Sequence, residues 1–152
     1  MKRTCITAVF LFVFCAGFLP AQSTAEEIET LLSTNAVTYA QAARFLLEAA
    51  DAMVTSDPQE AFRYAVWQKW LPKNAAANDT ARLDGISMLI MRSFDMKGGV
   101  MYSVAKKPHH AYRELVHKNI IQGRAGPAMK VSGERLLAIT GTMLSEKEKE
   151  TD

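Results

Sequence analysis

One stretch of this chain recurs 50 positions later without an insertion or a deletion. DPQEAFRYAVWQKWLPK at 57–73 and KPHHAYRELVHKNIIQG at 107–123 share a proline, an alanine, an arginine and a valine at matched places. The matched alanines are Ala61 and Ala111, and an aromatic residue follows each of them. A unit of this length cannot bury its apolar face alone, so the copies are expected to stack around a shared core.

The spacing of apolar residues predicts helices along most of the chain. Thr38 with Gln41 forms the pattern of a capping box, and Asp57 followed by a proline is typical of a helix start. Asp79 or Thr80 is expected to cap a third helix. Ser132 is expected to cap the last helix of the domain in the same way. The apolar faces expected to point inward comprise Tyr39, Ala42, Ala43, Leu46, Leu47, Ala50 and Val54, then Ala61, Phe62, Ala65, Val66 and Trp70, then Leu83, Ile86, Ile90 and Phe94, then Ala111, Tyr112, Leu115, Val116 and Ile120, and last Leu136, Leu137, Thr140, Met143 and Leu144.

These patterns predict a single all-α domain of about five helices over residues 26–144, built from one half and two full helix–loop–helix repeats. VMYSV at 100–104 follows a Gly-Gly break and is expected to be a short strand or an extended lead-in. The segment 145–152 is charged and free of apolar residues, which predicts a flexible tail.

The first 25 residues have the pattern of a secretory signal peptide. Two basic residues precede an apolar run at 5–19, and small residues follow it, with cleavage expected after Ala21 or Ala25. The alternative, a membrane anchor, would need about 20 apolar residues, more than this run offers. Both cysteines, Cys5 and Cys15, lie inside this segment, so a cleaved chain would have no disulfide, zinc–thiolate site or catalytic thiol.

The charge of the chain gives no argument for nucleic acid as a partner. Of 18 basic residues, Lys2 and Arg3 belong to the leader-like segment, which leaves 16 against 16 acidic residues. No later segment is apolar and long enough to suggest a transmembrane helix in the cleaved chain. We therefore expect an exported or periplasmic protein that is close to neutral.

The second copy, VMYSVAKKPHHAYRELVHKNIIQGRAGPAMKVSGERLLAI, is similar to an S-layer homology repeat. The residues that carry the resemblance are Tyr102 and Val104 in the lead-in, His109, Ala111 and Tyr112 at the helix start, and Ile120, Ile121 and Gly123 in the turn. The copy at 57–94 matches more weakly, and TYAQAARFLLEA at 38–49 resembles the second helix of a truncated repeat.

The resemblance implies an exported envelope module that binds wall polysaccharide, with three repeats often acting as one unit. In that family the arginine of a Thr-Arg-Ala-Glu motif commonly contacts the acidic polymer. Arg82 and Asp84 of ARLD match the Arg and Glu of this motif, whereas Tyr39 and Gly133 stand where the other two arginines would be.

Two further side chains are candidate ligand-binding residues. Trp67 aligns with a histidine and is expected to be exposed, where a flat aromatic face suits a sugar ring; the alternative is a place in the core. Arg135 lies at the start of a capped helix, whose free N–H groups favour anions. His110 and His117 are seven apart and lack an apparent third ligand, so we predict no metal site.

No catalytic constellation and no cofactor-binding motif is apparent, so we predict that the protein is not an enzyme. The expected function is a cell-envelope module, with peptidoglycan-associated glycan as the candidate ligand. The alternative is a periplasmic protein-interaction scaffold that keeps the fold without binding glycan. The expected partners are thus a cell-wall glycan or an envelope protein.

Overall fold

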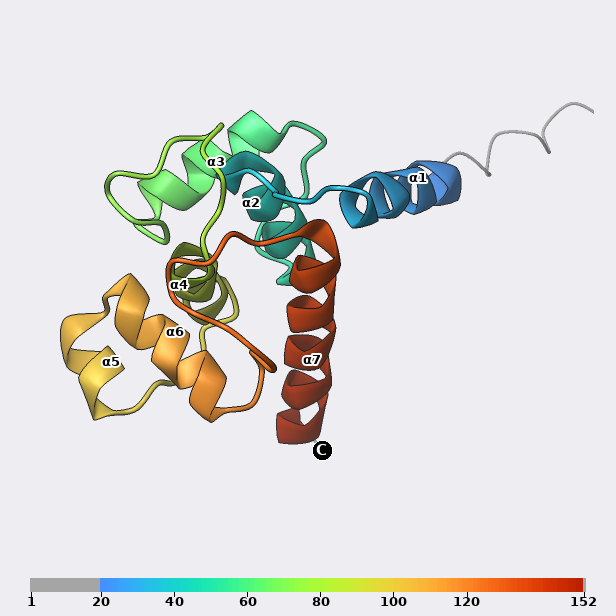
Figure 1. Ribbon diagram of the computed structural model, residues 1–152. Helices are drawn as coiled ribbons and strands as arrows, with labels where there is room; N and C mark the ends of the chain where they lie inside the picture. Colours follow the sequence, from blue (N-terminus) through green and yellow to red (C-terminus); the bar gives the residue numbers. More distant parts are fainter. Residues whose placement is uncertain (1–19, 152) are drawn as a thin grey trace, which may run out of the picture.

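The structure is a computed structural model that describes residues 20–151, and it confirms the predicted all-α class (Figure 1). Within these residues there are seven helices, rather than the predicted number of about five, and two isolated β-bridges, but no extended strand. The helices are α1 (Pro20–Leu32), α2 (Tyr39–Ala49), α3 (Pro58–Trp67), α4 (Leu83–Ser93), α5 (Val100–Ala105), α6 (Pro108–His117) and α7 (Gly133–Thr151). The leader-like pattern at 1–25 falls mostly outside the described residues, and α1 spans both expected cleavage positions.

The three repeats meet in a closed ring of backbone hydrogen bonds. The N–H of Val37 donates to the carbonyl of Val131 (2.9 Å), that of Val131 to Ala81 (3.1 Å), and that of Ala81 back to Val37 (2.8 Å). All three residues are fully buried and stand two places before the first residue of α7, α4 or α2. Buried backbone groups outside a helix must find partners, and each repeat here supplies them to the next. The half repeat, through Val37, therefore donates and accepts in this ring as the two full repeats do, and we call the ring the junction between the repeats.

The structure corrects the predicted start of α4. Its N-cap is Arg82, because Thr80 forms a β-bridge with Thr38 and the carboxylate of Asp79 accepts from Ala76 N–H (3.2 Å). The capped helices therefore begin after Thr38, Arg82 and Ser132, at spacings of 44 and 50 residues rather than the expected 42 and 52. The other predicted caps are confirmed. Thr38 and Gln41 form the capping box, and Asp57 accepts from Gln59 N–H (2.9 Å).

Four helices end in the same way. In each, the second residue beyond the C-cap donates its N–H across the turn to a carbonyl five places earlier, at 2.9 Å, as in a Schellman motif. The residue in between adopts a left-handed conformation, with φ between 49° and 59°, and it is Asp51, Lys69, Asp95 or Asn119. Lys69 and Asn119 are 50 residues apart, so the sequence repeat is also a repeat of backbone conformation.

We expect Lys69→Gly to stabilise the protein by about 0.5–1 kcal/mol. A left-handed conformation costs an L residue roughly 1–2 kcal/mol, and the extra freedom of glycine in the unfolded chain takes back about 0.5–1 kcal/mol. The midpoint of chemical denaturation measures the change. Lys73→Gly, at an exposed loop position without a positive φ, is the control and should show no gain. A lower midpoint for Lys69→Gly would contradict the left-handed turn.

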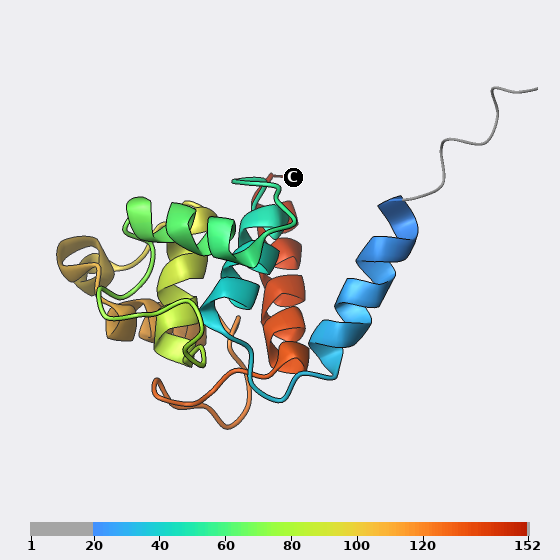
Figure 2. The same ribbon diagram turned by 90° about the horizontal axis from the view of Figure 1, so that it is seen from above.

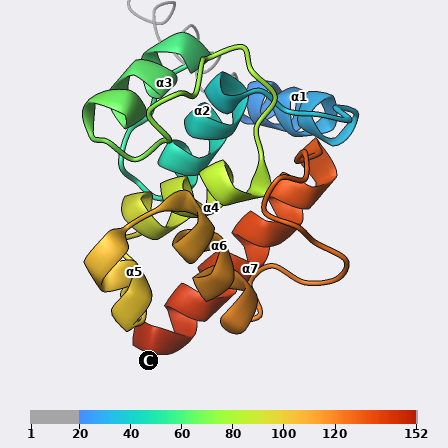
Figure 3. The same ribbon diagram turned by 60° about the vertical axis from the view of Figure 1, so that its left-hand side comes forward.

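The core is centred on α4, which packs against α2 on one side and α6 on the other (Figure 3). Its expected inward residues are buried, and so are three further apolar side chains, Met88, Leu89 and Met91, together with the polar Ser87. A helix enclosed by neighbours buries more than one stripe, which a one-sided pattern does not predict. The expected burial of Ala61, Ala65, Ala111 and Leu115 is confirmed.

Several expected core positions are wrong. Val66 and Val116, at matched places in the two copies, are exposed because the buried faces of α3 and α6 run through Ala61–Ala65 and Ala111–Leu115. Val54 lies in the loop after α2, and it is 79% exposed. Leu144 is also partly exposed, at 38%, although its neighbour Met143 is buried.

Two segments differ in conformation from the expectation. VMYSV at 100–104 is helical in α5, because the N–H groups of Ser103 and Lys106 bond back to Gly99 (3.0 Å) and Tyr102 (2.8 Å). The segment 145–151 continues α7 instead of forming a flexible tail. Glu and Lys are good helix formers, and here Lys149 pairs with Glu146 at 2.7 Å.

Candidate functional site

The sequence-predicted pair Arg82 and Asp84 lies at the start of α4. The two side chains form an ion pair at 3.0 Å, and the other carboxylate oxygen of Asp84 accepts from Gly85 N–H at 2.9 Å. Arg82 takes the N-cap place held by Thr38 and Ser132 in the other repeats, so it corresponds to the threonine of the motif and not to its arginine. The sequence alignment at Arg82 is therefore off by one position.

None of the three positions that follow the N-caps of α2, α4 and α7 is an arginine, although the resemblance implied one there. Its place is taken by Tyr39, Leu83 and Gly133, and all three residues are buried. Burial raises the pKa of Tyr39, and its ring lies so close to Gly85 that a Cβ there would overlap it. These positions pack the junction between repeats and present no charge to a ligand.

The side chain of Arg135 is held by hydrogen bonds within the protein. Its guanidinium donates to the carbonyls of Arg124 (3.2 Å) and Gln122 (3.3 Å) and lies 3.1 Å from the sulfur of Met129. These three acceptors lie on the loop that links α6 to α7, so Arg135 holds this loop against the first turn of α7. The same loop bonds to α4, through Leu83 N–H to Met129 O (2.9 Å). Arg82, Asp84 and Arg135 thus gather around one loop.

Trp67 lies apart from that group. Its side chain is 74% exposed at the end of α3, as the sequence predicts. Its ring centroid is 6.3 Å from that of Tyr64, which in turn makes an edge-on contact with Trp70 at 5.8 Å. The three rings form an aromatic cluster on α3 and the turn after it. Trp67 belongs to α3, whereas Arg82 and Arg135 lie at the starts of α4 and α7, so residues 20–151 do not bring the predicted residues into one site.

The histidines form no recognisable metal centre. The rings of His109 and His110 meet edge-on with centroids 5.9 Å apart, and His117 lies at the end of α6. Among residues 20–151 no group of three or more His, Cys, Asp or Glu side chains could hold a metal ion. Nor is any helix in this part of the chain long and apolar enough to cross a membrane.

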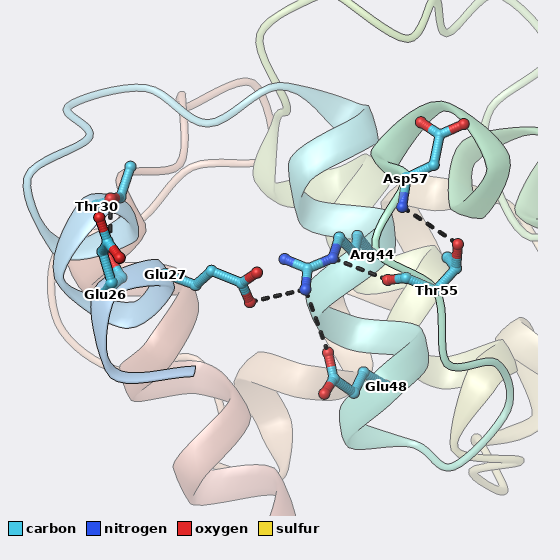
Figure 4. A network of polar contacts seen from close by, with 7 residues as sticks. All are labelled: Glu26, Glu27, Thr30, Arg44, Glu48, Thr55 and Asp57. Atoms are coloured by element: carbon cyan, nitrogen blue, oxygen red, sulfur yellow. Dashed lines mark hydrogen bonds and ion pairs between the residues drawn. The ribbon is translucent and has the colours of Figure 1, made fainter. Parts of the chain in front are cut away.

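A groove of about 580 Å³ separates α1 from α2. Arg44 lies in its wall and donates to Glu27 (2.7 Å) and to the carbonyl of Thr55 (2.9 Å), with Glu48 4.0 Å away (Figure 4). Figure 4 shows the guanidinium directed at these partners from α2. Arg44 thus pairs with two of the three carboxylates that line this groove, Glu27 and Glu48, and the pair with Glu27 ties α1 to α2.

A second pocket, also of about 580 Å³, lies where α4 ends and α5 begins. Three of the residues that line it have a buried polar atom that makes no hydrogen bond in the structure: Nε of Arg92, Oγ of Ser93 and the hydroxyl of Tyr102. A polar group left unpaired in this way costs about 1–3 kcal/mol, and native structures contain few of them. Three such atoms around one pocket make it the strongest candidate for a ligand site in the described part of the chain.

The charges around this α4–α5 pocket favour an anion. Arg92, Lys97 and Lys106 line it together with a single carboxylate, that of Asp95. The carboxyl end of α4 adds roughly half a negative charge, which does not offset an excess of two full positive charges. Burial raises the pKa of Tyr102, while the charge of Arg92 and the closeness of its side chain to the hydroxyl act in the opposite direction. The Tyr102 hydroxyl therefore stays protonated and can donate a hydrogen bond to an anionic oxygen.

Sequence reasoning missed this pocket because its residues have no motif spacing. Arg92 and Ser93 end one helix and Tyr102 sits in the next, with the Gly98-Gly99 break between them. A Cβ at Gly98 would overlap the Tyr102 ring, so glycine is what allows the ring to turn inward. Gly98-Gly99 was the only sequence signal near this pocket, and by itself it indicated a break in secondary structure and not a ligand site.

Comparison of the chain with protein-family models, with curated proteins and with solved structures finds no match.

Proposed function

We propose that this protein is a non-enzymatic, exported module of the cell envelope that holds an acidic group of a wall-associated glycan in the α4–α5 pocket. The observation that carries the proposal is the set of unpartnered polar atoms of Arg92, Ser93 and Tyr102 in a cation-lined pocket. A guanidinium and two hydroxyl groups are suitable donors for a carboxylate or phosphate. Export is proposed from the leader-like segment 1–25.

The half-buried Trp70 also lines this pocket, and its edge-on contact with Tyr64 places it at the margin of the α3 aromatic cluster. An aromatic face next to charged donors suits a sugar that carries an acidic group, because the ring can stack while the acid is bound. The three-repeat junction supports the resemblance to S-layer homology repeats, in which three repeats act together. The buried substitutes for the motif arginines argue for the α4–α5 pocket as the site in this chain.

The test uses Tyr102→Phe, which removes one donor and leaves the ring. The free protein should be as stable as the parent or more stable, since a buried hydroxyl without a partner is lost. Binding of polygalacturonate, a carboxylate-bearing polysaccharide, should weaken about tenfold or more, because a hydrogen bond to a charged group contributes about 1.5–3 kcal/mol. Calorimetric titration measures the affinity and thermal denaturation the stability.

Two controls sharpen the result. Tyr112→Phe removes the hydroxyl of a half-buried tyrosine that does not line the pocket, and Arg82→Ala removes the arginine that the sequence motif suggested. Both should retain polygalacturonate binding, and none of the proteins should bind neutral dextran. Co-sedimentation with insoluble cell-wall sacculi repeats the comparison on the natural material. Equal affinity for parent and Tyr102→Phe would refute the pocket, and loss of binding only in Arg82→Ala would return the site to the start of α4.

A second candidate function is a protein-interaction scaffold, and the exposed aromatic cluster on α3 favours it. Trp67 is 74% exposed and Val66, beside it, is 46% exposed, whereas exposed tryptophan is uncommon outside contact surfaces. Failure of the parent protein to bind either polygalacturonate or sacculi would favour the scaffold. The search for the partner would then begin with cross-linking from position 67.

A further inference from the structure

Helix α5 exposes an apolar face. Val100 is 81% exposed, Met101 70% and Val104 82%, so half of this six-residue helix consists of large apolar side chains in water. Tyr102, which is 5% exposed, anchors the opposite face. Among the described helices α5 packs substantially only against α6. It lies at the end of the molecule opposite to α1, as Figures 1 and 2 show, so nothing in the fold covers it.

Charged side chains border this face. Lys97, Lys106 and Lys107 flank α5 and are exposed. Two carboxylates lie near it: Asp95 in the α4–α5 pocket and Glu114 of α6, whose oxygen would lie 2.8 Å from a Cβ at Gly99. The lysines on each side of the helix also border the α4–α5 pocket, through Lys97 and Lys106. The three lysines, called the basic rim below, exceed the two carboxylates by one positive charge.

This combination fits an anionic lipid surface better than a protein partner. Apolar side chains at a membrane interface enter the boundary between headgroups and acyl chains, while lysines remain in water next to the phosphates. Protein interfaces are instead enriched in aromatic residues and depleted in lysine. Among residues 20–151, the exposed large aromatic side chain is that of Trp67, which lies on α3 and not on α5.

We propose that α5 docks the protein reversibly onto an anionic phospholipid surface, with Val100, Met101 and Val104 entering the interface and Lys97, Lys106 and Lys107 facing the phosphates. The contact is peripheral, because six residues cannot span a bilayer. It goes beyond glycan binding in the pocket, since the residues that enter the lipid are not those that would hold the glycan.

The experiment is co-sedimentation with vesicles of phosphatidylglycerol and phosphatidylcholine, compared with vesicles of phosphatidylcholine alone. The protein is used as the producing cell leaves it, with its N-terminus defined by mass spectrometry, and every variant shares that N-terminus. The parent should bind the anionic vesicles, and binding should fall as the salt concentration rises. The double substitution Val100→Ser and Val104→Ser should weaken binding at least tenfold.

Val54→Ser is the matched control, because this valine is 79% exposed but lies in the loop after α2, away from the basic rim. It should bind anionic vesicles like the parent. Tyr102→Phe should also keep vesicle binding, which separates this proposal from the glycan pocket. Equal binding by the double variant, or equal binding of the parent to neutral vesicles, would overturn the proposal. Absence of any vesicle binding would overturn it too and would assign the α5 face to a protein partner.

Discussion

Leu89→Ala should lower the free energy of unfolding by about 2–5 kcal/mol, the range for removing a large side chain from a closed core. Leu89 is fully buried on α4, the helix that packs against both α2 and α6. Because helices on two sides hold the site open, the cavity cannot collapse easily, and we expect a loss in the upper half of this range. Small domains are stable by only about 5–15 kcal/mol, so the variant would lose a large part of its stability.

Urea denaturation measures this loss, provided the slope of the transition stays the same in parent and variant. Val54→Ala is the control, since it shortens an exposed side chain and should change stability by about 0.5 kcal/mol or less. A loss below about 1 kcal/mol for Leu89→Ala would show that α4 is not enclosed on both sides.

Gly133→Ala should destabilise the protein by about 1–3 kcal/mol or detach α1 from α7. Gly133 is the first residue of α7, and its N–H donates to the carbonyl of Thr34 at 2.8 Å. A Cβ at this position would overlap the backbone carbonyl of Leu31. Backbone cannot rotate away as a flexible side chain can, so the end of α1 has to move.

Gly141→Ala is the matched control on the same helix. A Cβ there meets nothing within 4 Å, and alanine in a helix interior is favoured over glycine by about 1 kcal/mol. The two substitutions should therefore change stability in opposite directions. Denaturation midpoints measure the sign, and limited proteolysis of residues 20–32 reports detachment of α1. A stabilising Gly133→Ala would contradict the close contact between the two helices.

The two binding proposals predict different surfaces and can fail separately. The glycan proposal depends on Tyr102 and Arg92 inside the α4–α5 pocket, whereas the lipid proposal depends on Val100 and Val104 on the outer face of α5. If both hold, one short helix lines a polymer site with one face and contacts a membrane with the other. If only the lipid contact holds, the scaffold interpretation and its exposed Trp67 become the stronger account of the wall-facing side.

Local features of the fold could be predicted from the sequence because they depend on neighbouring residues. The Thr38 capping box and the Asp57-Pro58 helix start involve contacts within three residues, and both are confirmed. The matched alanines Ala61 and Ala111 are buried, since the period of 50 reports a shared environment. Boundaries were less predictable. Thr80 has the chemistry of a cap, yet its bridge to Thr38 moves the cap to Arg82.

The sequence by itself determined that this chain is helical, repeated and held by an ordinary core, because periodicity and caps are properties of short segments. Only the tertiary structure decided where function could lie. The buried ring of Val37, Ala81 and Val131 turns a half repeat into a full member of the junction. The α4–α5 pocket unites Arg92 with Tyr102 across a glycine break, and whether a polar atom finds a partner depends on residues that are distant in sequence.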